Sequence, residues 1–193
     1  MTHIPTDESL LERMSRGDET AFLLLYQRHR DTTFRFAYRM LGSVELAEDV
    51  THDCFLSLIR RPERFDSSRA SLRTYLYSAV RNLVLKRFRK TGNETSVEHL
   101  PEAFAPSDSG GPLRRLLDEE LALEVQRAIS ALPPLQREAL VLFEYEQQTL
   151  AEIAEIAGAD VGTVKSRLHR ARARLRKELA PYFKSYAAVA AVE

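Results

Sequence analysis

The sequence predicts an all-α fold class: two small helical domains joined by a flexible acidic linker, the C-terminal one containing a helix-turn-helix. Three observations predict it. Apolar residues recur with a helical period through nearly every segment, and no useful stretch alternates with the period of a strand. An internal stretch, residues 91–111, has no periodicity and is rich in turn formers. The last third of the chain combines a short apolar helix, a glycine and a strongly basic helix.

Four predicted helices make up the N-terminal domain, at residues 7–16, 19–41, 43–60 and 71–90. Gly17 and Gly42 end the first two, because glycine accepts the left-handed conformation that commonly follows a helix. Ser43 can cap the third helix, and Pro62 breaks the chain after it. The residues expected to face the core are Leu10, Leu11, Met14, Phe22, Leu25, Tyr26, His29, Phe34, Ala37, Leu41, Ala47, Val50, Cys54, Leu58, Leu72, Leu76, Ala79, Val80 and Leu83.

The C-terminal domain is predicted to begin with two further helices, which Pro133 and Pro134 separate. The apolar face of the first consists of Leu117, Leu121, Val125, Ala128 and Leu132. The second follows at residues 135–143. We expect the domains to span residues 1–91 and 114–180, with the linker at 92–113 and a tail at 181–193.

The helix-turn-helix occupies residues 149–177. Its first helix has an apolar face formed by Leu150, Ile153, Ala154 and Ala157. Gly158 suits a turn that needs a positive φ, and Asp160 can cap the second helix. Val164, Leu168 and Ala171 fall on one face of that helix and can pack back onto the first.

The second helix of this motif is very basic. It carries seven bases against one acid, Glu178, and the bases are Lys165, Arg167, Arg170, Arg172, Arg174, Arg176 and Lys177. A helix-turn-helix places such a helix in the major groove of DNA, where the first turns reach base edges and later cations reach phosphates. A charged helix that serves only solubility is the alternative. The concentration of cations directly after the turn favours DNA.

The net charge of the chain is zero, but the charges are segregated. Residues 61–90 contain nine bases and two acids, whereas residues 92–124 contain eight acids and two bases. Each segment therefore keeps its own electrostatic field although the sum cancels.

Composition also indicates the cellular compartment of the protein. Cys54 is the only cysteine, so an internal disulfide is excluded and a reducing compartment fits. No apolar run approaches the ~20 residues of a membrane span, and the first residues lack the pattern of a signal peptide. We expect a cytoplasmic protein without membrane insertion. The scattered histidines predict no metal site.

The helix at 71–90 interleaves aromatic and basic residues. Tyr75, Asn82, Lys86 and Arg89 share one side, and Phe65 lies in the preceding loop. Rings that stack on bases beside cations that follow phosphates are typical of surfaces for single-stranded nucleic acid. The alternative is that Tyr75, Tyr77 and Phe88 are core or boundary residues.

The helix at 43–60 has an acidic stripe opposite its apolar face. The stripe consists of Glu45, Asp49, His52, Asp53 and Leu56. An acidic face repels DNA, so a protein partner with a basic surface is the natural hypothesis. Plain solubility is the alternative.

The order of these modules resembles a bacterial sigma factor of the extracytoplasmic-function (ECF) type, over about residues 7–180. AEDVTHDCF at 47–55 is similar to the segment that docks on the clamp helices of RNA polymerase β′. LRTYLYSAVRN at 72–82 looks like the segment that reads and opens the −10 element, with Tyr75 at a position where Trp is more usual. LPPLQRE at 132–138 and GTVKSRL at 162–168 look like parts of the domain that reads the −35 element.

The resemblance implies a transcription initiation factor that directs core RNA polymerase to promoters. It implies −35 duplex contacts by Thr163, Lys165, Ser166, Arg167, His169 and Arg170. It implies contacts to the unwound −10 strand by Phe65, Arg69, Ser71, Tyr75, Asn82, Lys86 and Arg89. Asp49, His52, Asp53 and Leu56 would bind core polymerase. In the linker, Glu94, Glu98, Glu102 and Asp108 would lie in the channel that later carries RNA.

The partners so implied are core RNA polymerase, through its β′ clamp helices and β flap, and promoter DNA. Whether an anti-sigma factor is a further partner is left open by the sequence. No catalytic residues, cofactor or metal are expected, because polymerase supplies the chemistry.

Two other classes of function stay open. A dimeric helix-turn-helix repressor or activator with a sensor domain would explain the C-terminal motif, but not the second basic helix or the acidic linker. An enzyme acting on nucleic acid would need clustered carboxylates or a metal set beside the basic helices, and Glu63 and Asp66 alone do not supply one. Binding to core polymerase separates all three.

Overall fold

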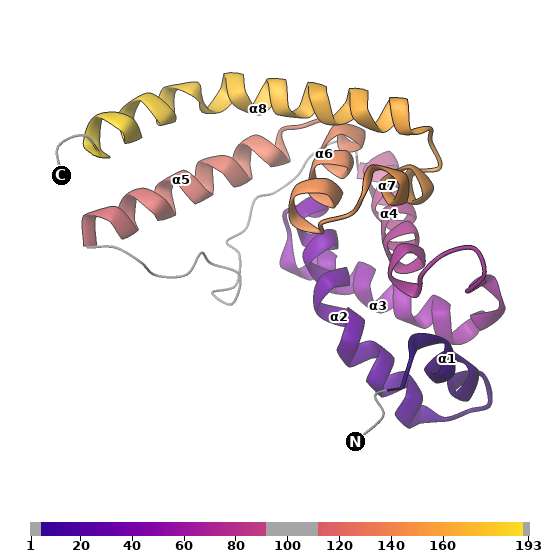
Figure 1. Ribbon diagram of the computed structural model, residues 1–193. Coiled ribbons are helices and arrows are strands. Elements are labelled where there is room, and N and C mark those ends of the chain that lie inside the picture. The colour runs from indigo at the N-terminus through magenta and orange to yellow at the C-terminus, as the bar shows by residue number, and fades with distance from the viewer. Residues whose placement is uncertain (1–4, 92–111, 191–193) are drawn as a thin grey trace.

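The computed structural model describes residues 5–91 and 112–190, and the regular elements of those residues are all helical. The N-terminal body consists of α1 (Asp7–Ser15), α2 (Glu19–Leu41), α3 (Val44–Arg60), the 3-10 turn η1 (Pro62–Arg64) and α4 (Leu72–Thr91). The C-terminal body consists of α5 (Pro112–Ser130), α6 (Pro134–Leu140), the π-helical turn η3 (Val141–Tyr145), α7 (Leu150–Ala157) and α8 (Val161–Ala190) (Figure 1). The predicted all-α class is confirmed.

The predicted ends of the first helices agree with the observed caps. Asp18 begins α2 by accepting a hydrogen bond from the backbone N–H of Ala21, and Ser43 begins α3 in the same way with Leu46. Gly42 ends α2 with a φ of 72°, in the left-handed region that glycine enters without strain. These local signals explain why the boundaries could be read from the sequence.

Two boundaries differ from the expectation. α5 begins at Pro112, so the last two residues of the expected linker are helical, and proline at the first helical position is favourable. α8 continues through Pro181 to Ala190, so most of the expected tail is helical backbone. The rest of the linker, including Glu94, Glu98, Glu102 and Asp108, lies outside the described residues.

The core of the N-terminal body contains most of the predicted residues, together with several that were not predicted. Phe36, Tyr38 and Met40 of α2 are buried, although they lie off the predicted inward stripe. The reason is tertiary, because α2 contacts α1, α3 and α4 of its own body and also α5, α6 and η3 of the C-terminal body. The Tyr38 hydroxyl, for example, accepts a hydrogen bond of 2.6 Å from Gln126 of α5.

The C-terminal body contains the predicted helix-turn-helix. Thr149 and Glu152 form a reciprocal capping box at the start of α7, and Gly158 makes the turn with a φ of 59°. The Asp160 carboxylate accepts a hydrogen bond of 2.8 Å from the N–H of Thr163 at the start of α8. Val164, Leu168 and Ala171 are buried, so this predicted packing is confirmed.

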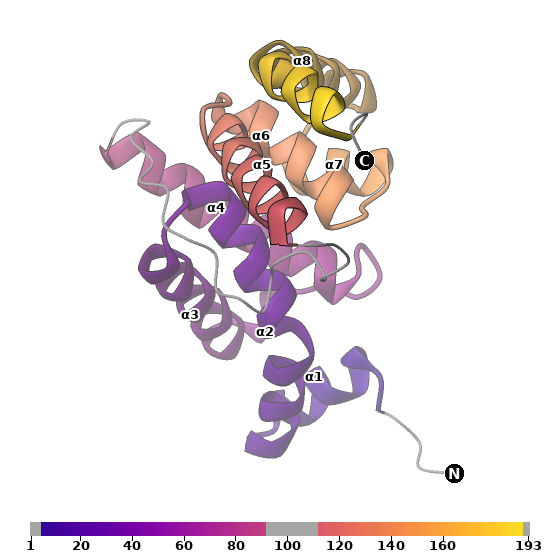
Figure 2. The same cartoon turned by 90° about the vertical axis from the view of Figure 1, so that its left-hand side faces the viewer.

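The two bodies lie against each other. α7 packs on α4, while η3, α5 and α6 contact α2. Beyond this contact, α5 and the C-terminal half of α8 run side by side as an arm (Figures 1 and 2). The contact between the bodies is the feature of the fold that the sequence did not predict.

Candidate nucleic-acid and protein interfaces

The basic face of α8 is directed away from the core of the C-terminal body. Lys165, Ser166, His169 and Arg170 are exposed on the first turns of the helix, opposite its buried stripe. Thr163 is half-buried and donates a hydrogen bond of 2.6 Å to Asp160, which also lowers the pKa of the Asp160 carboxyl. The structure therefore gathers these predicted residues on one side of α8.

Two arginines of α8 are turned toward other parts of the protein. Arg172 is paired with Glu144 of η3 at 2.5 Å, and its guanidinium lies over the Phe143 ring. Arg167 is half-buried, and its charge acts to lower the pKa of the buried Glu138. Arg167 is therefore less exposed than the other predicted −35 cations, Lys165 and Arg170, and part of its charge acts within the protein.

The loop before α4 holds an aromatic pair. The rings of Phe65 and Tyr75 meet edge to face, with centroids 5.5 Å apart. Asp66 braces the loop, since its carboxylate accepts hydrogen bonds from the N–H and hydroxyl of Ser68, and these bonds lower its pKa. Arg69 and Ser71 are exposed beside the pair.

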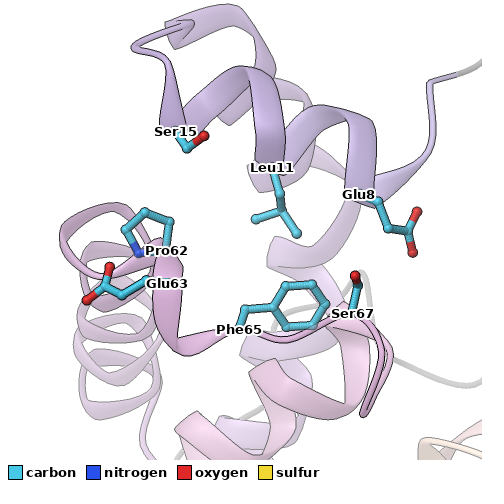
Figure 3. Close-up of a pocket in the computed structure, with 7 residues that line it drawn as sticks. All are labelled: Glu8, Leu11, Ser15, Pro62, Glu63, Phe65 and Ser67. Atoms are coloured by element: carbon cyan, nitrogen blue, oxygen red, sulfur yellow. The ribbon is translucent and has the colours of Figure 1, made fainter.

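Two cavities flank the Phe65 ring. One of about 350 Å³ lies between α1 and the loop, and Figure 3 shows Phe65 and Leu11 pointing into it from opposite sides. The other, of about 220 Å³, is lined by Arg69 and Tyr75 and also by Glu155 of the C-terminal body.

A third hollow brings together part of the predicted α4 surface. Its volume is about 530 Å³, and it is lined by Tyr75, Asn82 and Lys86, with the buried Cys54 at α3. Burial raises the pKa of the Cys54 thiol to about 12, so the thiol stays protonated and serves as an apolar wall. Arg89 lies exposed near the end of α4.

The two tyrosines of α4 have different environments. Tyr77 is buried and meets Phe36 edge to face, so it belongs to the core. Tyr75 is half-buried, with one side against Phe65 and the other on the hollow. Partial burial raises the pKa of its hydroxyl, and the ring keeps an accessible edge. The sequence alone left these roles open, and burial separates them.

The acidic stripe of α3 is exposed along its length. Asp49, His52, Asp53 and Leu56 all lie on the outer face, and Leu56 retains 42% of its surface. Asp49 is 59% exposed and lies 3.4 Å from the guanidinium of Arg87. The stripe therefore offers carboxylates and an apolar side chain to a partner.

Three buried ionisable residues of the C-terminal body were not predicted as functional or structural residues from the sequence. Glu146 is 3% exposed, accepts hydrogen bonds from Arg39 at 3.1 Å and from the Tyr77 hydroxyl at 2.8 Å, and its backbone carbonyl accepts one from Arg73 at 2.6 Å. Glu138 is 1% exposed and accepts one from Arg81 at 2.8 Å. These contacts join the C-terminal body to α2 and α4.

Arg137 is the third of these residues. Its guanidinium donates to the carbonyl of Met40 near the end of α2, to that of Ser130 at the end of α5 and to that of Leu132 just after it, and it lies over the Phe88 ring. Burial lowers its pKa to about 10. Arg137 and Glu138 are charged residues within the otherwise largely apolar run at residues 135–143. Charged residues are seldom buried unless they are paired, so the sequence could have signalled buried partners for them.

Among the described residues, no group of three or more His, Cys, Asp or Glu side chains could hold a metal ion. Within the same part of the chain, no helix has the length and apolar character needed to cross a membrane. What the surfaces offer is cations, aromatic edges and an acidic stripe.

Comparison with known families matches both bodies. Residues 25–94 match Sigma-70 region 2, and residues 122–175 match Sigma-70, region 4. The ECF RNA polymerase sigma factor SigE of Mycolicibacterium smegmatis is 33% identical over 183 residues, which cover 92% of this chain and 69% of that protein. SigW of Bacillus subtilis, also an ECF RNA polymerase sigma factor, is 31% identical over 183 residues, covering 88% and 94%.

Solved structures share the fold. The sigma factor RpoE in complex with the anti-sigma factor NepR from Bartonella quintana gives a TM-score of 0.67 at 24% identity, covering 82% of this chain and 96% of that one. CnrH in complex with the cytosolic domain of CnrY gives a TM-score of 0.65 at 24% identity, covering 91% and 97%.

Proposed function

The chain belongs to the family of ECF RNA polymerase sigma factors, and from this premise we propose that it binds core RNA polymerase and directs it to specific promoters. The main support for the proposal is that the chain has two separate surfaces that differ in the groups they expose. They follow one another in the order of regions 2 and 4 of the family. α8 presents exposed cations on a helix-turn-helix, whereas α4 and its loop present aromatic edges beside cavities. A duplex and an unwound strand need these two kinds of surface.

The −35 element would be read by the exposed first turns of α8. Lys165, Ser166 and Arg170 stand where a recognition helix reaches base edges, and His169 adds a further donor. Thr163 and Arg167 would hold this face in position. The Thr163 hydroxyl bonds to the capping Asp160, and the charge of Arg167 acts on Glu138. Later cations of α8 would follow phosphates.

The unwound −10 strand would be held by α4 and the preceding loop. Phe65 and Tyr75 offer ring surfaces to unstacked bases, and Arg69 and Ser71 lie beside them. Asn82, Lys86 and Arg89 continue the path along the helix. Stacking on aromatic side chains is how single strands are commonly held.

Core polymerase would dock on α3. Asp49, His52, Asp53 and Leu56 supply an acidic and apolar strip that would dock on the clamp helices of β′, while the C-terminal body would meet the β flap. We place this work in the cytoplasm, where bacterial transcription takes place. An anti-sigma factor stays a predicted partner.

Transcription with purified core polymerase tests the proposal. We expect the chain, mixed with core enzyme and a library of random double-stranded templates, to select a promoter class with separated −35 and −10 elements. Without core polymerase it should bind those templates weakly. Tight operator binding by the free protein as a dimer, with no stimulation of core polymerase, would favour a repressor instead.

A further inference from the structure

The cavity between α1 and the loop before α4 differs in chemistry from the −10 surface beside it. The described residues that line it carry two carboxylates (Glu8 and Glu63), two hydroxyls and three apolar side chains, and no cation. The neighbouring cavity of about 220 Å³ shares the wall formed by Phe65 but is also lined by Arg64 and Arg69. A phosphate is therefore attracted to the second cavity and repelled from the first.

Two apolar side chains face each other across the first cavity. Leu11 of α1 and Phe65 of the loop point into it from opposite sides (Figure 3). Phe65 is half-buried, so part of its ring is open to a ligand. An extruded nucleic-acid base is commonly held by stacking between aromatic and apolar side chains. The walls of the cavity thus suit the faces of a base, although its charges exclude the backbone.

The carboxylate of Glu8 is a hydrogen-bond acceptor at one end of this cavity. Figure 3 shows it at the same end as Ser67, whereas Glu63 lies at the opposite end. Glu8 is exposed, and no described residue forms a hydrogen bond or an ion pair with its side chain. Its oxygens are therefore free to accept from the edge of a ligand.

The helix that carries Glu8 is tied down at both ends. Asp7, the preceding residue, forms an ion pair with Arg28 of α2 and lies 2.8 Å from Nε2 of His29. At the other end, Arg13 pairs with Asp18 at 2.8 Å. The position of Glu8 relative to the loop is thus fixed, as a hydrogen bond that discriminates between ligands requires.

We propose that this cavity is a second base pocket, which takes an unpaired base with an exocyclic amino group from the strand held by α4 and its loop. The inference rests on the function proposed above and adds a specificity to it. The phosphates of the strand follow Arg64 and Arg69, while one base turns between Leu11 and Phe65. The amino group of cytosine, adenine or guanine donates to Glu8. Thymine has no amino group, and its carbonyl oxygens are repelled by the carboxylate, so the pocket discriminates against thymine.

Transcription by the chain with core polymerase on pre-melted templates tests the pocket. The templates carry the promoter selected as described above, with each of the four bases placed in turn at every position of the unwound −10 strand. We expect one position at which the wild type discriminates against thymine by about tenfold. Glu8→Gln should reduce this ratio to about twofold or less, because an amide can also donate to the thymine carbonyls.

Glu12→Gln is the matched control. It removes the same charge from the same helix, at an exposed site where the partner of Glu12 is Arg16. This variant should keep the discrimination against thymine. Because Glu8 is also exposed, Glu8→Gln should keep the melting temperature of the wild type, which circular dichroism measures.

The outcomes separate the pocket from the function on which it rests. The pocket is overturned if the wild type discriminates against thymine at no position, if Glu8→Gln keeps the discrimination, or if Glu12→Gln loses it equally. Weaker binding of Glu8→Gln to core polymerase with unchanged base preferences would make the cavity a protein contact, and likewise overturns the pocket. In each of these cases promoter-selective transcription by the wild type still upholds the proposed function, whereas its absence overturns both.

Discussion

Glu146 and Gln147 show how one backbone position supports a contact between distant segments. Gln147 has a φ of 54°, the one positive value among the non-glycine residues that the structure describes. This turn ends η3 and directs the chain into α7, while Glu146 stays buried against α2 and α4. A residue with a Cβ is strained in this conformation, because the Cβ approaches the following carbonyl oxygen.

Substitution of Gln147 tests that strain. The left-handed conformation costs an L-residue roughly 1–2 kcal/mol, and the extra chain entropy of glycine offsets about 0.5–1 kcal/mol of the relief. Gln147→Gly should therefore leave the free energy of unfolding unchanged or raise it by up to about 1.5 kcal/mol. Gln147→Ile should lower it, because a β-branched side chain is more restricted in the left-handed region than an unbranched one. Urea unfolding measures both, and a glycine variant less stable than the isoleucine variant would contradict the reading.

Glu138 gives the fold a specific pH dependence. Burial raises its pKa above the ordinary value of 4.5, although Arg81 acts in the opposite direction. A raised pKa in the folded state stabilises the protein below the unfolded pKa, and this contribution is lost as pH rises through the folded pKa. Wild type should therefore lose stability relative to Glu138→Gln as pH increases from about 4.5 toward 7. Urea unfolding at several pH values checks this, and a constant difference between the two proteins would refute it.

The helices themselves are specified by local chemistry. Ser43, Gly42 and Asp160 are caps whose role follows from a few neighbouring residues, and for this reason the helix ends could be predicted. The π-helical turn of η3 could not, because a widened turn depends on packing around Glu146 rather than on periodicity. The helix at 135–143 was therefore predicted as continuous, whereas α6 ends at Leu140.

α3 allows the docking proposal to be tested on a single helix. Asp53 is exposed whereas Val50 and Leu58 are buried, so Asp53→Lys should keep the fold and weaken binding to core polymerase by about tenfold or more. Asp31→Lys, an equal charge change at an exposed site of α2, is the control. Fluorescence-detected titration of core enzyme measures the affinity. Equal binding by Asp53→Lys and wild type would reduce the stripe to a solvated surface.

At the scale of the whole molecule, the sequence predicted both bodies but not their contact. Each body has its own helical periodicity, which local patterns report. The contact depends on pairs far apart in the chain, such as Arg39 with Glu146 and Arg81 with Glu138. A single sequence carries no signal that joins such residues. The burial of Tyr38, whose hydroxyl is bonded to Gln126 of α5, was not predicted for the same reason.

The candidate surfaces were predicted more fully than the contact. Lys165, Ser166 and Arg170 could be placed on one exposed side of α8, because a helix presents its residues in a fixed order. The distinction between Tyr75 at the surface and Tyr77 in the core required the structure, since it depends on which side of α4 meets α2 and η3.

The central claim is that α8 reads duplex DNA and α4 holds an unwound strand. Transcription by the chain with core polymerase, on duplex templates and on templates pre-melted at the −10 element, tests it most directly. Arg170→Ala should weaken promoter recognition by about 1–3 kcal/mol of free energy on both templates, because pre-melting does not replace a major-groove contact. Tyr75→Ala should lose a similar amount, about 1–3 kcal/mol, on duplex and recover part of it on the pre-melted template. Equal defects of Tyr75→Ala on both templates, with a lowered melting temperature, would contradict the account and make Tyr75 a core residue.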